Sequence, residues 1–209
     1  MKDSGIPWIG LIPEHWEVRR LATAYVENRS TNTDLSNTDA FQFNYGSLVP
    51  KSRIYKESED AEVYSKYTVI SPDDIVINGL NLNYDFVSQR VAISKNNGII
   101  TSAYVCITPR ENINSSYFCY LFKAMDAMKL FHGMGTGIRL TLSYGELKKS
   151  LIPVPPIEEQ NAMVLYIESK LNKIDNFISS LQSEIDQLKE YKQRLISDVV
   201  TGQIDVSTD

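Results

Sequence analysis

The sequence has few of the residues from which catalytic and metal centres are usually built. It contains two histidines, His15 and His132, and two cysteines, Cys106 and Cys119. Two histidines cannot supply the ligands of a histidine-rich metal site, and two cysteines make no disulfide framework. We interpret the cysteines as buried small apolar residues in a reducing compartment. The sequence therefore predicts a cytoplasmic protein that needs no metal and no cofactor.

Sequence signatures of several enzyme classes are also missing. There is no GxxxxGK[ST] loop for nucleoside triphosphates, no serine elbow and no HExxH motif. The Asn/Asp-Pro-Pro-aromatic motif of amino-methyltransferases is absent. Gly133, Gly135 and Gly137 lack the GxGxxG spacing and do not join an apolar strand to a long helix, which argues against a dinucleotide site. The sequence favours a protein that is not an enzyme.

No stretch approaches the roughly 18 apolar residues of a membrane span, so we expect no membrane partner. The net charge of −5 is unevenly placed. Residues 1–156 carry 16 basic and 16 acidic side chains, whereas residues 157–209 carry 5 and 10. The acidity therefore lies in the C-terminal part, and the neutral front part can still carry a basic face toward nucleic acid.

Residues 157–200 contain no glycine and no proline, so nothing in them breaks a helix. Their apolar residues recur at alternating steps of four and three, which is the heptad pattern of a coiled coil. The a positions are Leu171, Ile178, Ile185, Lys192 and Val199, and the d positions are Ile167, Ile174, Leu181, Leu188 and Leu195. We call these ten a and d residues the seam. A helix this long needs a partner that covers the seam. The partner is a second copy, a different protein, or the chain's own globular part.

The front part is predicted to be rich in β-structure. Short apolar stretches at 41–49, 66–70, 75–77, 87–93 and 99–107 are separated by turn residues and read as strands. Asn96-Asn97-Gly98 reads as a hairpin turn between two of them. Residues 114–129 have apolar side chains at helical spacing. We expect an α+β fold with a recognition domain at 1–156, a long helix at 157–202 and a tail at 203–209.

Almost the whole chain resembles one recognition half of the specificity (S) subunit of type I restriction–modification enzymes. The segments that carry the resemblance are IPEHWEV (12–18) with Leu21, DIVIN (74–78), GIITSAY (98–104), GTGIR (135–139), IPVPPIEEQ (152–160), LKEYKQRLI (188–196) and VTGQID (200–205). The resemblance implies a target recognition domain followed by a long helix of the family's conserved region. It also implies a non-catalytic subunit that reads DNA and holds the methyltransferase and restriction subunits.

Family members have two recognition domains separated by two long antiparallel helices, and they read a split target. This sequence has one domain and one helix. We therefore expect a homodimer with antiparallel helices, which makes an interface between identical patches and would read a palindromic split site. The seam, Lys192 included, is its expected interface, where Lys192 either fixes the register or extends to solvent.

The resemblance places the DNA contacts in the polar and glycine-rich loops of the domain. Asn and Gln side chains can pair with adenine edges and Arg with guanine, while glycine-rich backbone can donate N–H groups to phosphate. The expected contacts are Asn78, Asn81, Asn83, Tyr84, Gln89, Arg90, Gly133, Gly135, Thr136, Gly137 and Arg139, with Lys51, Arg53 and Tyr55 as further candidates. Taken alone, each Asn or Tyr is more often an ordinary loop residue, whereas the segment 133–139 taken together fits a functional and a structural role equally.

Two other functions stay open at this point. The chain could be an interaction module, such as a decoy or a remnant, that pairs with another S subunit without reading DNA alone. It could also be the specificity domain of a nuclease that has lost its catalytic part. Direct DNA binding by the purified chain separates the first alternative from a DNA-reading subunit, and a metal-dependent cleavage assay tests the second.

Overall fold

A computed structural model describes residues 1–52 and 56–206, without the side chains of 57–59. The chain forms two compact units, Met1–Asn161 and Ala162–Asp209. The strands of the first unit are β1 (Lys2–Asp3), β2 (Leu11–Ile12), β3 (Glu17–Arg20), β4 (Tyr25–Glu27), β5 (Phe41–Asn44), β6 (Ser47–Pro50), β7 (Thr68–Ile70), β8 (Ile75–Ile77), β9 (Val91–Ile93), β10 (Gly98–Ile100), β11 (Val105–Pro109) and β12 (Leu151–Val154). The helices are α1 (Glu57–Tyr64), α2 (Ser115–Ala127), α3 (Leu130–Met134), α4 (Tyr144–Leu147) and α5 (Ile157–Val200), with a 3₁₀ turn at Leu21–Thr23.

A four-stranded antiparallel sheet in the order β4-β11-β8-β9 forms the centre of the first unit. One of the two inner strands, β8, is the run Ile75-Val76-Ile77, whose side chains are fully buried. Such a continuous apolar stretch is what a strand covered on both faces requires. The remaining strands form two-stranded antiparallel ladders, β1-β2, β3-β12, β5-β6 and β7-β10.

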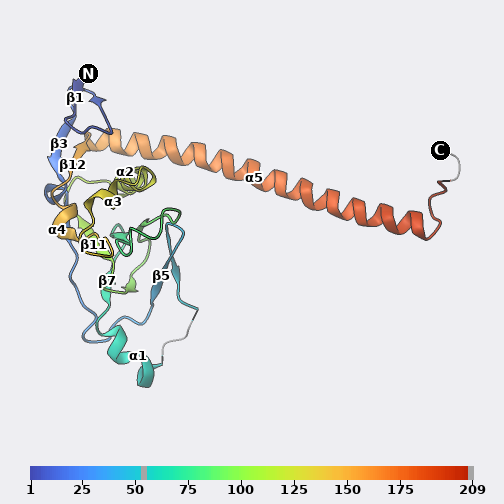
Figure 1. The fold of residues 1–209 in the computed structure, drawn as a ribbon, viewed down its shortest axis with the longest axis horizontal. Coiled ribbons are helices and arrows are strands. Elements are labelled where there is room, and N and C mark those ends of the chain that lie inside the picture. Colours follow the sequence, from blue (N-terminus) through green and yellow to red (C-terminus); the bar gives the residue numbers. More distant parts are fainter. Residues whose placement is uncertain (53–55, 207–209) are drawn as a thin grey trace. The chain divides into compact units, whose positions relative to one another are not determined.

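Helix α2 supplies much of the aromatic core. The Asn114 side chain accepts a hydrogen bond from the Tyr117 amide and caps the helix start, because a side-chain oxygen there satisfies a free N–H. Phe118 and Phe122 are fully buried and meet the ring of Tyr25 edge-on, at centroid distances of 5.6 and 6.0 Å. Both cysteines are buried and free. Figure 1 shows α2 and the sheet within this unit.

Several strand predictions need correction. The stretch 41–49 is a hairpin, β5-β6, because Gly46 adopts a φ of +74° and reverses the chain. The hairpin predicted at Asn96-Asn97-Gly98 is wrong, since β9 pairs with β8 and β10 pairs with β7. Gly98 instead pairs with Ile70 as part of β10, and a Cβ there would come within 2.5 Å of the Asp39 carbonyl oxygen, which favours glycine at this position. The stretch 99–107 is divided between β10 and β11, and the acidic run 57–62 lies in α1.

The predicted long helix is confirmed as α5, drawn as one uninterrupted ribbon in Figure 1. It ends where Gly202 takes a φ of +75° and the amides of Gln203 and Ile204 donate to the Asp198 carbonyl, a common helix stop at glycine. The fold is therefore α+β, with a β-rich domain followed by a long C-terminal helix. Among the described residues, no helix is long and apolar enough to cross a membrane.

Candidate nucleic-acid interface

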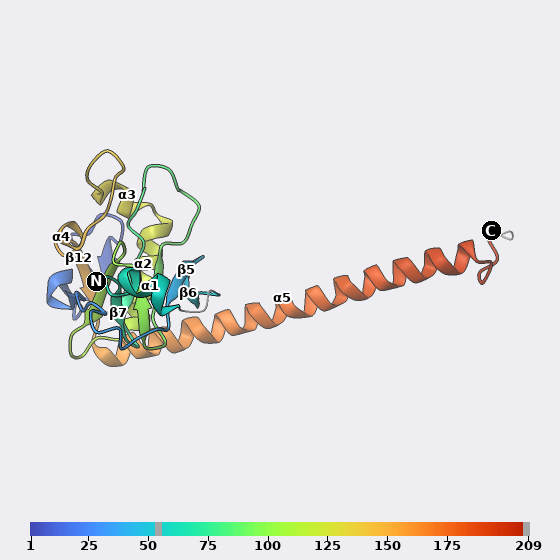
Figure 2. The same cartoon turned by 90° about the horizontal axis from the view of Figure 1, so that it is seen from below.

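Two loops far apart in the sequence are joined into one surface of the first unit. The first loop, 78–90, links β8 to β9, and the second, 135–143, follows α3. The Leu142 amide donates to the Gly79 carbonyl at 2.9 Å, and the Leu82 amide donates to the Leu140 carbonyl at 3.1 Å. The Asn83 side-chain amide donates to the Ile138 carbonyl at 3.2 Å. Both loops project from the same end of the unit (Figure 2).

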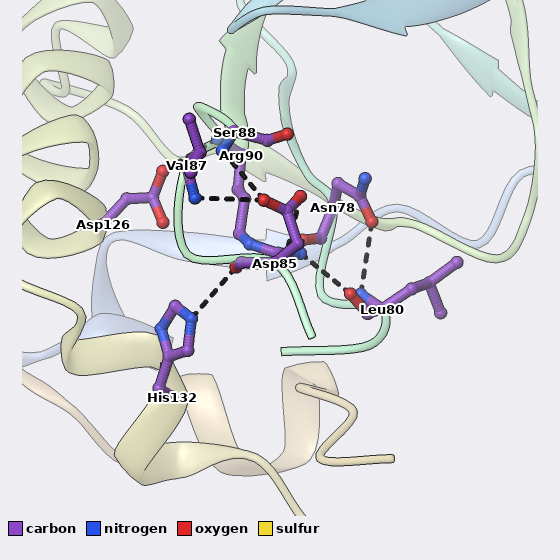
Figure 3. Close-up of polar contacts among 8 residues, drawn as sticks. All are labelled: Asn78, Leu80, Asp85, Val87, Ser88, Arg90, Asp126 and His132. Atoms are coloured by element: carbon purple, nitrogen blue, oxygen red, sulfur yellow. Dashed lines mark hydrogen bonds and ion pairs between the residues drawn. The ribbon is translucent and has the colours of Figure 1, made fainter. Parts of the chain in front are cut away.

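The first loop is wound around one buried arginine (Figure 3). The side chain of Arg90 is only 1 % exposed, and its guanidinium donates to the carbonyls of Asn78, Leu80 and Asp85 at 2.8–3.0 Å. Its charge lies 3.4 Å from the Asp85 carboxylate. The planar fork of arginine suits such multiple contacts, which a lysine could not reproduce. Because Arg90 is buried, we correct its expected role from direct DNA contact to positioning of the loop.

Residues from α2 and α3 complete this network. The buried Asp126 carboxylate of α2 accepts the Arg90 backbone amide at 2.8 Å. His132 of α3 donates to the Asp85 carbonyl at 3.3 Å, and its ring stacks on Phe86 with centroids 4.6 Å apart. Hydrogen bonds from Ser88 and Val87, together with the Arg90 charge, lower the pKa of Asp85 to about 2. The carboxylate therefore stays ionised wherever the protein is folded near neutral pH.

Buried polar atoms without a hydrogen-bond partner, among the described residues, also gather in this network. They are one side-chain atom each of Asn83, Arg90, Asp126 and His132. Burying such an atom unpaired costs roughly 1–3 kcal/mol, so native structures contain few of them. Three of the four atoms lie where the first loop meets α2 and α3, and the fourth belongs to Asn83, which contacts the second loop.

The tip of the second loop is a tight reverse turn. Thr136 and Thr141 pair across it, and Gly137 adopts a φ of +76°, which favours glycine. Ile138 is 96 % exposed, and Arg139 is exposed with no ion pair or hydrogen bond within the described part of the chain. On the first loop, Tyr84 and Val87 are also largely exposed. The joined loops therefore present aromatic, aliphatic and cationic side chains together.

The three glycines predicted to let backbone approach a ligand have different roles. Only Gly137 sits at the exposed turn. Gly135 packs against its own chain, since a Cβ there would lie 3.0 Å from Leu82 and Leu140, and Gly133 lies inside α3 with open space around it. Thr136 is exposed, next to the turn.

Gly79, which the sequence did not single out, is the tightest contact between the loops. A Cβ at this position would lie 2.5 Å from the Leu142 carbonyl oxygen, a backbone atom that cannot easily move. We expect Gly79→Ala to separate the loops and to lower the free energy of unfolding by about 1–3 kcal/mol, the usual cost of overpacking. Thermal melting measures the loss, and Gly133→Ala, in open space, serves as the control. Equal melting temperatures for the two variants would contradict the assigned contact.

The other predicted contact residues are distributed as follows. Asn81 and Gln89 are exposed on the first loop, whereas the Asn78 side chain accepts from the Leu80 amide. Gln89 adjoins the β5-β6 turn, because a Cβ at Gly46 would lie 2.6 Å from its side-chain oxygen. That turn exposes Tyr45, a residue that sequence reasoning missed although the Tyr-Gly step signals a turn.

Lys51 is not a free cation at this surface. Its ammonium donates to the Tyr67 hydroxyl at 2.8 Å and lies over the rings of Tyr64 and Tyr67. This contact supports a structural role for Lys51. Arg53 and Tyr55 lie outside the described residues.

The fold and this surface define a class of protein. It is an α+β domain with a composite loop surface, followed by a long helix that carries an exposed apolar seam. The family model described as "Type I restriction modification DNA specificity domain" matches residues 13–190. The chain belongs to this family.

Relatives agree with that assignment. The chain is 24 % identical over 216 residues to a putative type I restriction enzyme MjaX specificity subunit of Methanocaldococcus jannaschii, covering 96 % of this chain and 46 % of the relative. The fold is similar to the HsdS subunit from Thermoanaerobacter tengcongensis, with a TM-score of 0.60 at 17 % identity, over 93 % of this chain and 47 % of that one. The type I S subunit from M. genitalium matches with a TM-score of 0.53 at 13 % identity, over 90 % and 48 %. The chain thus spans about half the length of these relatives.

Proposed function

We propose that this chain is a non-catalytic specificity subunit that reads one half of a split DNA target. In this role it acts in the cytoplasm and assembles the methyltransferase and restriction subunits on double-stranded DNA. The observation that carries the proposal is the joining of the two loops by hydrogen bonds at Gly79, Leu82 and Asn83, which brings predicted contact residues to one surface. Membership of the family supports the same function.

The surface suits DNA chemically. The exposed guanidinium of Arg139 can bind a guanine edge or a phosphate, and the exposed amides of Asn81 and Gln89 can pair with adenine. Tyr84, Val87 and Ile138 add apolar contact area beside these polar groups. Apolar side chains at such positions can touch thymine methyl groups or enter a groove.

Two copies, joined through the exposed seam of α5, would together bind both halves of a split DNA target. A twofold axis through the interface relates the two recognition domains, so the two half-sites are inverted repeats of one sequence. This arrangement would place one recognition domain on each half-site.

Arg139→Ala should weaken binding to target DNA by about tenfold or more, because a good arginine–base contact contributes roughly 1–3 kcal/mol. The measurement is fluorescence anisotropy with a fixed duplex at one stated salt concentration, since phosphate contacts make affinity salt-dependent. Lys173→Ala removes one exposed positive charge from the helix and is the control. An unchanged dissociation constant for Arg139→Ala would count against the assigned surface.

The test of the proposed function is selection of bound fragments from a random pool of duplex DNA by the full-length chain. We expect enrichment of an inverted repeat split by a spacer of fixed length. Failure to enrich any sequence would contradict DNA reading by this chain alone. The exposed seam would then favour the second candidate function, an interaction module that pairs with another S subunit.

A further inference from the structure

The seam of α5 is open on the second unit. From Leu171 to Leu195, its apolar members are between 39 % and 60 % exposed, far from the usual burial of leucine and isoleucine. Because α5 is one continuous helix, these side chains share one face along its length. A face of this kind requires a partner helix, and the sequence of the seam specifies how a second copy fits it.

We infer that two copies pair antiparallel in a single register, with the twofold axis at the level of Ser183. This inference rests on the pairing of two copies in the proposed function and on the antiparallel orientation that the family resemblance implies, and it adds the register. Ser183 lies midway between the two ends of the seam, Ile167 and Val199. In an antiparallel pair, an a residue of one helix faces a d residue of the other, and residues equally far from the axis share a layer.

This register gives every seam residue a seam partner. Ile167 faces Val199 of the second copy, Leu171 faces Leu195, Ile174 faces Lys192, Ile178 faces Leu188, and Leu181 faces Ile185. Each layer occurs twice by symmetry. A shift by one heptad in either direction leaves seam residues at both ends without a seam partner, so it buries less apolar surface.

The residues that flank the seam match in the same register. At the g positions, Lys170 meets Asp198 of the second copy, and Phe177 meets Tyr191. At the e positions, Asp175 meets Lys189 of the second copy. All of these side chains are exposed on the single helix, apart from a half-buried Asp198. Opposite charges at flanking positions are the feature that sets orientation and partner choice in coiled coils.

Lys192 distinguishes this arrangement from a parallel pair. In a parallel, in-register pair the two Lys192 ammonium groups would share one layer of the core, where like charges repel strongly. The antiparallel register separates them by about 27 Å and places each against Ile174, from which a long lysine side chain can extend to solvent. The one like-charged pair it creates, between the two Glu184 residues, lies at the exposed flank.

Charge reversal with two rival rescues tests the orientation. Lys170→Glu should weaken dimerisation of the full-length chain about tenfold, because two symmetric attractive pairs become repulsive. Adding Asp198→Lys should restore the dimerisation constant to within about threefold, since it recreates both pairs. Adding Asp175→Lys to Lys170→Glu should not restore the dimerisation constant, because Asp175 faces Lys170 of the second copy only in the parallel pair. Sedimentation equilibrium at low salt measures all three variants.

Disulfide trapping tests the register itself. Leu171→Cys and Leu195→Cys chains, mixed and oxidised, should give a cross-linked dimer that contains one of each. Leu171→Cys alone should give none, because its two copies lie about 36 Å apart in this register. The native Cys106 and Cys119 are buried and do not compete.

Each other outcome overturns a stated part of the inference. Self-linking of Leu171→Cys, or rescue by Asp175→Lys, would show a parallel pair. Preferred linking of Leu171→Cys to Leu188→Cys would show a register shifted by one heptad. A chain that stays monomeric at all concentrations would contradict the dimer itself as well as the register. The selection of bound DNA fragments tests target reading independently of both.

Discussion

Replacing both Leu181 and Ile185 with aspartate should leave the chain folded but monomeric. Both side chains are more than two-fifths exposed on the single helix, so they contribute little to the fold of one copy. In the dimer, four such side chains would be buried at the centre of the interface. The dimer newly buries only about two-fifths of each side chain, roughly 0.6–1.3 kcal/mol each, so losing all four should weaken dimerisation by at least about 50-fold. Light scattering measures the halved mass.

Ser183→Asp with Gln187→Asp is the matched control. This pair adds the same charge at the same four-residue spacing, but on the outward face of the helix, where both residues are exposed. It should stay dimeric. A dimer that survives Leu181→Asp with Ile185→Asp would show that the two copies meet through another surface.

Arg90→Met should abolish DNA binding and destabilise the domain together. The substitution leaves the carbonyls of Asn78, Leu80 and Asp85 without their donor. Breaking a buried, hydrogen-bonded ion pair costs about 3 kcal/mol or more, which corresponds to roughly 10 °C in melting temperature for a domain of this size. Circular dichroism melting and anisotropy with target DNA measure the two effects.

Arg139→Ala is the natural comparison, because its side chain is exposed and unpaired in the described part of the chain. It should lose affinity for DNA while keeping its melting temperature. Arg90→Lys keeps the charge but cannot span three carbonyls, so it should lie between wild type and Arg90→Met. Normal DNA binding by Arg90→Met would show that the loop keeps its conformation without the guanidinium.

Local patterns in the sequence predicted the elements that depend on local physics. The heptads, with no glycine or proline, predicted a helix at 157–202, and α5 runs from Ile157 to Val200. The apolar run Ile75-Val76-Ile77 predicted a strand, and helical spacing predicted α2. In each case neighbouring residues along the chain determine the conformation, so one sequence is sufficient.

The features that the sequence missed depend on contacts between distant segments. Asn96-Asn97-Gly98 looks like a hairpin turn, yet Gly98 serves a close approach to Asp39 and Phe41. Arg90 looks like a DNA contact, yet it binds carbonyls that are brought to it by the fold. The candidate residues on the two loops were chosen for their chemistry, but their meeting depends on Gly79 and Leu142, whose pairing no local pattern indicates.

In the joined loops, the residues that hold the conformation differ from the residues that are exposed, and this separation affects how the domain could acquire a preference for a new DNA sequence. The anchors Arg90, Gly79 and Asp126 are buried, whereas Tyr84, Val87, Ile138 and Arg139 project from the tips. Exposed side chains at such positions usually alter stability by less than about 0.5 kcal/mol when they are exchanged. Under the proposed function, variation at the tips can therefore explore new target sequences without a loss of stability, and a library randomised at these four positions should yield altered specificities.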